Sequence, residues 1–327
     1  MSSTHSGAGP DGRYAEDVIE IPPRAWLAIL RRTLRSFTTD NLSLVAGGAT
    51  FFLLLAIFPA LAAFVALYGL LFDVATVEGH VAAMAGVLPA AAIDLVGAEL
   101  NRLASQPSGA LGVGFVVGLL IALWSANAGV KALFAALNQV YGEVEERGFV
   151  RLTLTSLAFT LAAIIGAALL LAAVVVVPIV LGRLGLSDAT HWMLSLLRWP
   201  VLLLLVMVGI AILFRYGGSR RPPRWRWIVW GAAVTAVLWV AASAAFSYYL
   251  SNFADYNATY GSLGAVVGFM MWLYVSLMIL FAGAELNAEV ERQLVTDTTV
   301  GPAKPMGSRG AMVADTLPED LEEPTPR

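Results

Sequence analysis

Long apolar runs, rather than an alternation of apolar and polar positions, dominate this chain. Six runs hold the roughly 20 residues that a helix needs to cross a hydrocarbon layer of about 30 Å. Helices are expected because each segment must satisfy its own backbone hydrogen bonds in lipid. The predicted spans are Leu44–Phe72, Ala110–Val130, Leu152–Leu181, Trp192–Phe214, Trp227–Leu250 and Ser262–Ala284. The sequence therefore predicts an all-α integral membrane protein with six transmembrane helices.

The positions of Lys and Arg predict how these spans are oriented. The cytoplasmic flanks of membrane helices are enriched in Lys and Arg. If both termini are cytoplasmic, 17 of the 20 Lys and Arg residues fall in cytoplasmic segments, and only Arg102, Arg183 and Arg198 lie outside. An odd number of spans would spoil this pattern. We therefore expect a multi-pass protein with both termini in the cytoplasm.

Two shorter segments have the pattern of amphipathic helices that lie on a membrane surface. In 24–37, a turn of about 100° per residue separates an apolar side from a basic side. The apolar side holds Trp26, Ile29, Leu30, Leu34 and Phe37, and the basic side holds Arg24, Arg31, Arg32 and Arg35. The second segment, 93–103, lies in the long loop after the first span and is expected on the outer face.

Residues 24–292 form the predicted membrane domain. The segments before and after it lack long apolar runs and amphipathic helices. Residues 1–23 and 293–327 are rich in Ser, Gly, Pro and acidic residues and show no helical or strand period. Such compositions bury too little apolar surface to fold by themselves. Both segments are predicted to be disordered cytoplasmic tails.

The composition agrees with a lipid environment and excludes cysteine-based chemistry. Hydrophobic residues make up 58% of the 327 residues and charged residues only 13%, more apolar surface than one soluble core of this size buries. The net charge of −3 gives no field for binding nucleic acid. The absence of cysteine excludes disulfides, thiolate nucleophiles and sulfur-ligated metals. We expect no cofactor, no metal and no nucleic-acid partner.

Polar side chains at membrane depth are costly and so are candidates for function. Asn127 and Lys131 lie one helical turn apart near the cytoplasmic end of the second span, and Glu285 and Asn287 lie at a similar depth in the sixth. We hypothesise that Lys131 and Glu285 form an ion pair that gates a helix bundle, with an asparagine bonded beside it. The alternatives are a lysine that only reaches the headgroups and two unrelated interfacial charges.

A proline, two glycine pairs and a polar cluster each have both a functional and a purely structural explanation. Pro59 predicts a kink in the first span, which either lines a cavity or only shapes the bundle. The glycine pairs Gly114 with Gly118 and Gly264 with Gly268 favour close helix packing. A cluster in the last outside turn either binds a polar headgroup or caps the sixth helix, and its members are Asp255, Tyr256, Asn257, Thr259 and Tyr260.

Several strings together resemble the YihY/BrkB family of bacterial inner-membrane proteins. They are ATFFLLLAIFPALAAFVALYG, LWSANAGVKALFAALNQVYGEVEERGF, RWRWIVWGA, YNATYGSLGAVVGFMMWLY and GAELNAEVER. The resemblance covers about residues 24–292. It departs at Ala56, where the family commonly has serine, and in RWRWIVWGA, which lacks a proline before the glycine. The resemblance implies an inner-membrane protein linked to virulence and lipid handling, with an older label of ribonuclease BN.

The leading functional hypothesis is transport or translocation of a lipid or another amphiphile in envelope maintenance, with membrane lipids as partners. A lipid path needs only a groove with polar patches at both interfaces, whereas an ion pathway buries more carboxylates. The alternative is a non-transporting scaffold that holds protein partners of the envelope. A nuclease needs clustered His, Asp and Glu ligands, and the three histidines, His5, His80 and His191, are far apart in the sequence. We therefore expect no enzymatic activity.

Overall fold

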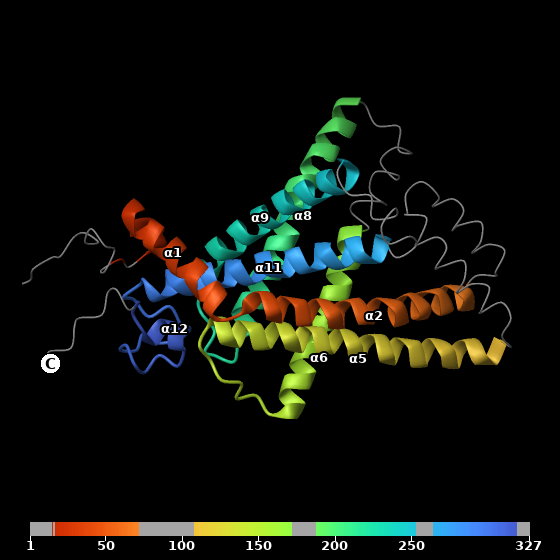
Figure 1. The fold of residues 1–327 in the computed structure, drawn as a ribbon, viewed down its shortest axis with the longest axis horizontal. Coiled ribbons are helices and arrows are strands. Elements are labelled where there is room, and N and C mark those ends of the chain that lie inside the picture. Colours follow the sequence, from red (N-terminus) through yellow and green to blue (C-terminus); the bar gives the residue numbers. More distant parts are fainter. Residues whose placement is uncertain (1–14, 16, 72–107, 172–187, 253–263, 319–327) are drawn as a thin grey trace, which may run out of the picture.

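The computed structural model is an assembly of long α-helices (Figure 1). It describes residues 15, 17–71, 108–171, 188–252 and 264–318. The long helices are α2 (Leu42–Leu71), α5 (Ser108–Val140), α6 (Phe149–Leu171), α8 (Asp188–Tyr216), α9 (Trp225–Asn252) and α11 (Gly264–Arg292). The short ones are η1 (Val18–Glu20), α1 (Pro23–Thr39) and α12 (Met312–Asp315). Within the described residues the only β-type pairing is one isolated bridge, so the predicted all-α class is confirmed.

Each predicted span overlaps one long helix, and residues 72, 172–181 and 262–263 of the predicted spans lie outside the described part. Five of these helices, α5, α6, α8, α9 and α11, are long and apolar enough to cross a membrane. The described part of α2, Leu42–Ala56, passes the same test together with α1, as a pair bent by 61°. The structure is therefore that of a multi-pass membrane protein with five or six spans. α2 is helical through Pro59, and the predicted kink there stays a prediction because side chains from 57 to 71 lie outside the described part.

The predicted basic amphipathic helix is α1. Its stripe Ala25, Ile29 and Thr33 is buried, and α1 contacts α11 and α2. The neighbouring apolar side chains, Leu30 and Leu34 among them, remain exposed. α1 thus has one side against the protein and an adjoining apolar side free to meet lipid, in agreement with the predicted surface position. The second amphipathic segment, 93–103, lies outside the described residues.

Helix packing leaves much of the apolar surface uncovered. α2 and α5 lie side by side, α6 crosses α5, and α9 packs between α8 and α11 (Figure 1). Large aromatic residues such as Tyr141, Phe214 and Phe281 are fully buried where these helices meet. Many others, including Trp124 and Phe149, are more than 70% exposed. A membrane protein tolerates this exposure because lipid, not water, covers those side chains.

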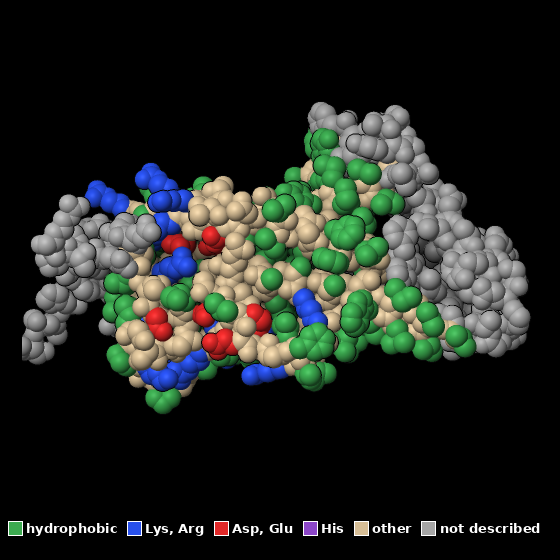
Figure 2. Space-filling model, turned by 60° about the horizontal axis from the view of Figure 1, so that its bottom comes forward, with side chains coloured by type: hydrophobic (Ala, Val, Ile, Leu, Met, Phe, Trp, Pro, Cys, Tyr) green, Lys and Arg blue, Asp and Glu red, His purple; other side chains and the backbone are tan. Residues whose placement is uncertain are grey.

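Charged side chains gather at one end of the molecule, which we call the charged end. It holds α1, α12 and the connections α5–α6 and α8–α9 (Figure 1). Figure 2 shows Lys, Arg, Asp and Glu over this part and hydrophobic side chains over the rest of that face. The two connections are bonded to each other, since the backbone N–H of Glu146 donates to the Ser219 hydroxyl at 3.1 Å. The side chain of Gln139, at the end of α5, also donates to the Asp40 carbonyl between α1 and α2 at 2.6 Å.

The described parts of the two predicted tails differ from the expectation of disorder. Residues 293–318 pack on the charged end, with Thr298, Thr299 and Val313 fully buried. Near the amino terminus, Val18 and Ile21 are buried against α9 and α11 residues. The composition of the carboxyl-terminal segment does not indicate this order, because many hydrogen bonds and only a few buried apolar side chains, such as Leu294 and Val313, hold it in place. Residues 1–14, 16 and 319–327 lie outside the described part.

Arg309 is the centre of that segment. Its buried guanidinium donates to four backbone carbonyls, those of Val295, Thr296, Lys304 and Ala314. Carbonyls of irregular segments need such donors when they are buried. One side chain therefore closes the loop formed by residues 295–314.

Close contact between α9 and α11 depends on glycines that the sequence analysis did not select. A Cβ at Gly283 would overlap the Thr235 hydroxyl, and one at Gly231 would lie 2.6 Å from Oδ1 of Asn287. The selected glycines, Gly114 and Gly118 in α5 and Gly264 and Gly268 in α11, are helical, and their packing role stays a prediction.

Substituting Gly283 with alanine should loosen the α9–α11 pair. Overpacking costs about 1 to 3 kcal/mol, so the purified Gly283→Ala protein should unfold at a clearly lower temperature. Gly209→Ala in α8 is the matched control because a Cβ there meets nothing within 4 Å. Thermal unfolding followed by tryptophan fluorescence measures both. Equal unfolding temperatures for the two variants would contradict the packing assigned to Gly283.

Removing the Arg309 side chain should release the carboxyl-terminal segment while leaving the helices in place. Hydrogen bonds from a charged donor contribute about 1.5 to 3 kcal/mol, so Arg309→Ala should expose this segment to protease. Lys304→Ala is the control, because that side chain is exposed and Lys304 bonds to Asp297 and Arg309 through its backbone only. Limited proteolysis with mass mapping checks it. Cleavage of 293–318 at equal rates in both variants would contradict the account.

Candidate functional site

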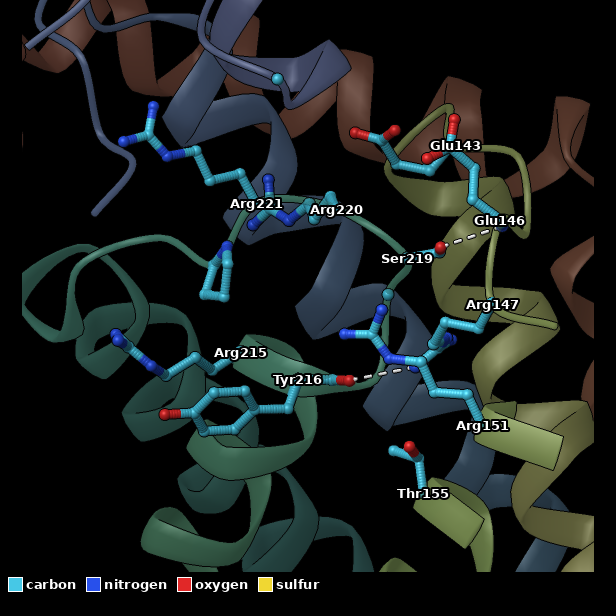
Figure 3. Close-up of a pocket in the computed structure, with 13 residues that line it drawn as sticks. Glu143, Glu146, Arg147, Arg151, Thr155, Arg215, Tyr216, Ser219, Arg220 and Arg221 are labelled. Carbon is cyan, nitrogen blue, oxygen red and sulfur yellow. Dashed lines mark hydrogen bonds between the residues drawn. The ribbon is translucent and has the colours of Figure 1, made fainter. Parts of the chain in front are cut away.

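A cavity of about 580 Å³ opens at the charged end and is the candidate site (Figure 3). Arg151 and Thr155 come from the start of α6, and Arg215 and Tyr216 from the end of α8. The charged lining consists of Arg147, Arg151, Arg215, Arg220, Arg221, Glu143 and Glu146. Five arginines against two glutamates make the lining basic.

Arg147 clamps the two sides of this cavity together. Its Nη2 lies 2.7 Å from Oε2 of Glu145, and its guanidinium also donates to the carbonyls of Tyr216 and Gly217. The guanidinium carbon lies 4.8 Å from the centre of the Phe134 ring. The connection before α6 is thereby fixed to the end of α8.

Arg220 and Arg215 fix the α8–α9 connection from inside the protein. Both terminal nitrogens of Arg220 donate to Oε2 of Glu291 at 2.9 Å, and its guanidinium carbon lies 4.0 Å from the Tyr141 ring centre. Arg215 donates to the Pro223 carbonyl and stacks on Trp225 at 4.5 Å. Arginine suits such positions because it combines a planar cation with several donors.

Some basic donors of the lining have no protein acceptor. Arg151 forms no hydrogen bond or ion pair with any described residue, and its side chain is exposed. The Nε–H groups of Arg215 and Arg220 are buried and have no acceptor among the described residues. Unsatisfied buried donors are rare because each costs about 1 to 3 kcal/mol. The arrangement is suited to binding an anion.

Two carboxyls beside the cavity have shifted pKa values. The hydrogen bonds from Arg147 hold the pKa of Glu145 at about 2. Burial raises the pKa of Glu143, while the backbone N–H of Met312, at 2.7 Å from Oε1, acts in the opposite direction. The Glu145–Arg147 pair therefore stays charged over the physiological range.

The hypothesised Lys131–Glu285 ion pair does not form in the structure. Lys131 points to α6, where its Nζ donates to the Thr153 hydroxyl at 2.9 Å and lies 5.2 Å from the Phe149 ring centre. Glu285 is fully buried, and neither carboxylate oxygen has a hydrogen-bond partner in the part of the chain that the structure describes. The two residues lie on different helices, α5 and α11, and their side chains have different surroundings. A span predicts how far along a helix a residue lies, not the direction in which its side chain points.

The asparagines of that predicted cluster are both buried. The Oδ1 of Asn127 has no hydrogen-bond partner among the residues that the structure describes. Asn287 contacts Gly231 and lines a second, smaller cavity of about 260 Å³ together with Trp26 and Trp230. These residues therefore do not join Lys131 in one site. The predicted outer cluster, Asp255, Tyr256, Asn257, Thr259 and Tyr260, lies outside the described residues.

The arginine cavity was missed from the sequence because its arginines were used only to orient the spans. Their spacing, with RYGGSRR closely following one span and ERGFVR preceding another, places basic residues at two helix ends. A signal was present in the repeated arginines beside aromatic residues. What the sequence could not supply was the contact between these two connections.

Comparison with known proteins gives consistent matches to one group of membrane proteins. The family model described as virulence factor BrkB matches residues 33–306. The chain is 32% identical over 215 residues to ribonuclease-like protein YfkH of Bacillus subtilis, which covers 63% of this chain and 74% of that one. It is 25% identical to UPF0761 membrane protein IL2447 of Idiomarina loihiensis over 81% of this chain and 91% of that protein. No solved structure matches the chain.

The Glu145–Arg147 pair predicts a particular pH dependence of stability. The pKa of Glu145 is about 2 in the folded protein, below its usual 4.5, so its ionised form stabilises the fold. That contribution is complete above pH 4.5 and disappears as the pH falls through about 2. The unfolding temperature of the wild type should therefore exceed that of Glu145→Gln by a constant amount at neutral pH, and the difference should vanish in strong acid.

The control for this prediction is the same substitution in a chain that lacks Arg147. In an Arg147→Gln background, Glu145→Gln should have little effect at any pH, because coupling between partners is what a double-mutant cycle measures. A difference that persists in that background, or one that grows on acidification, would contradict the assigned pair.

Proposed function

The chain belongs to the virulence factor BrkB family of membrane proteins, and we propose that it moves a lipid or another amphiphile across the bacterial inner membrane. One observation carries the proposal. The basic cavity lies at the start of α6 and the end of α8, two helices whose apolar side chains are widely exposed. A charged site and a lipid-facing surface therefore adjoin, as an amphiphilic cargo requires.

The apolar side of this arrangement is built by α6. Among the candidate spans it has the smallest buried share. Phe149, Val150 and Leu154 flank Arg151 along the helix and are each more than 60% exposed. On α8, Val208 and Ile212 are partly exposed above Arg215. A cargo can place its head against the arginines and its tail along these side chains, where transfer from water favours burial by about 25 cal/mol per Å².

Orientation forms part of the proposal. With both termini in the cytoplasm, the charged end faces the cytoplasm and its arginines follow the positive-inside pattern. The cavity then lies at the level of the inner leaflet headgroups. Transport by this chain would start or finish at that leaflet.

The alternative function is a scaffold without transport. The ordered segment 293–318 supports it, because residues 301–308 present a continuous exposed surface at the charged end. A scaffold would use this surface to hold envelope proteins. The proposal includes no ribonuclease activity, since the sequence offers no clustered histidines for the chemistry named in the Bacillus relative.

Lipid movement can be tested with purified protein in liposomes that contain a fluorescent phospholipid. Dithionite quenches only the outer leaflet unless lipid moves, so wild-type protein should extend quenching beyond the outer-leaflet fraction. Arg151→Gln should slow the additional quenching about tenfold, the loss expected for one charge-assisted contact. Arg226→Gln, which removes an exposed arginine outside the cavity lining, should leave the rate unchanged.

Quenching limited to the outer leaflet, with folded wild-type protein in the vesicles, would contradict transport of these lipids. A measured interaction of residues 301–308 with an envelope protein would then favour the scaffold.

A further inference from the structure

We infer that the arginine cavity binds a phosphate group, either on the head of an anionic phospholipid or as free inorganic phosphate, with Arg151 as a direct contact and Arg221 as a nearby positive charge. The inference deepens the proposed function by naming the chemistry of the head group, and it rests on that function only for the lipid form of the ligand. The charges, free donors and rigidity of the cavity support phosphate binding.

The charges favour an anion on one wall of the cavity. Arg147 and Arg220 are neutralised by Glu145 and Glu291, which are bonded to them directly. Arg151, Arg215 and Arg221 have no carboxylate partner among the described residues. No carboxylate of the described residues is bonded to these three guanidinium groups, and the cavity lining holds more arginines than glutamates.

The carboxylates of the lining come from one connection. Glu143 and Glu146 both belong to the stretch between α5 and α6, and Figure 3 shows them apart from Arg215. Glu143 already accepts the Met312 N–H. Glu146 has no bonded side-chain partner among the described residues, so its charge opposes an anion.

Arg151 and Thr155 present free donors to the cavity from α6. They lie one helical turn apart, and neither side chain has a hydrogen-bond partner among the described residues. The Arg221 guanidinium instead points away from Arg151 (Figure 3), and its Nη1 donates to the Arg309 carbonyl at 3.4 Å. Arg221 therefore adds positive charge near the cavity rather than a contact. A phosphate has several oxygens and can accept from the Arg151 guanidinium and the Thr155 hydroxyl together.

The walls are fixed before any ligand arrives. The clamp of Arg147 joins α6 to α8, and the backbone N–H of Arg221 donates to the Gly310 carbonyl at 3.0 Å. A site that needs little ordering loses less free energy on binding. At about 580 Å³ the cavity exceeds a bare phosphate and has room for a small head group.

Three arginine variants and one glutamate variant test this site in the full-length purified protein. Binding of inorganic phosphate is measured at constant ionic strength from the shift of the thermal unfolding curve, with chloride as the reference anion. Arg151→Gln should weaken phosphate binding about tenfold, and Arg221→Gln, which removes a nearby charge without a contact, about two- to fivefold. Arg226→Gln should leave it unchanged.

A gain of binding provides an independent check that misfolding cannot imitate. Glu146→Gln removes an opposing charge and should tighten phosphate binding about two- to fivefold, in the range of exposed charge interactions. Phosphate binding that is equal in all four variants, or no different from chloride in the wild type, would overturn the inference.

The source of the phosphate is determined by a second titration with short-chain phosphatidic acid and phosphatidylcholine below their micelle concentrations. Binding of phosphatidic acid tighter than inorganic phosphate, and lost in Arg151→Gln, assigns the site to a lipid head. Equal affinity for phosphatidic acid and inorganic phosphate assigns it to the free ion. Equal binding of phosphatidylcholine and phosphatidic acid would contradict a site built for anionic phosphate.

Failure of this inference and failure of the proposed function have different signatures. Wild-type lipid movement without arginine-dependent phosphate binding would refute the inference and leave transport standing. Phosphate binding with the predicted variant pattern but without lipid movement would refute transport and leave the site standing.

Discussion

The arrangement of this protein depends on two buried carboxylates near the end of α11. Glu289 accepts from Arg32 of α1 at 2.8 Å, and Glu291 accepts from Arg220 at 2.9 Å and from the Thr298 hydroxyl at 2.6 Å. Removing one partner of a buried ion pair costs about 3 to 5 kcal/mol. α1, the α8–α9 connection and the carboxyl-terminal segment must therefore all meet α11 at one end of the bundle.

The basic cavity is a consequence of this constraint. Once Glu291 holds Arg220, the short α8–α9 connection presents Arg221 and the end of α8 beside the start of α6, where Arg147 closes the contact. Basic residues that would repel one another on a free surface are thus brought together and only partly neutralised. Because the neighbouring faces of α6 and α8 are apolar and exposed, this charge lies next to the lipid-facing surface.

The sequence was sufficient to predict the helices but not the contacts between them. Apolar runs predict each long helix because length and composition determine membrane insertion, and the period of α1 predicted its two-sided character. Arg32 and Glu289 are 257 positions apart, and nothing local pairs them. Lys131 and Glu285 were paired because they share a depth, yet Lys131 faces Thr153. The folded carboxyl-terminal segment escaped prediction because hydrogen bonds from residues such as Arg309 replace an apolar pattern.

The central claim is that one ligand touches the arginine cavity and the exposed faces of α6 and α8 together. The most direct measurement uses a phosphatidic acid with a photoreactive group in its acyl chain, cross-linked to the protein in liposomes and mapped by mass spectrometry. The account predicts labelling concentrated on 149–161 of α6 and 204–216 of α8, and competition by unlabelled phosphatidic acid. Labelling spread evenly over all exposed helices, without competition, would contradict it.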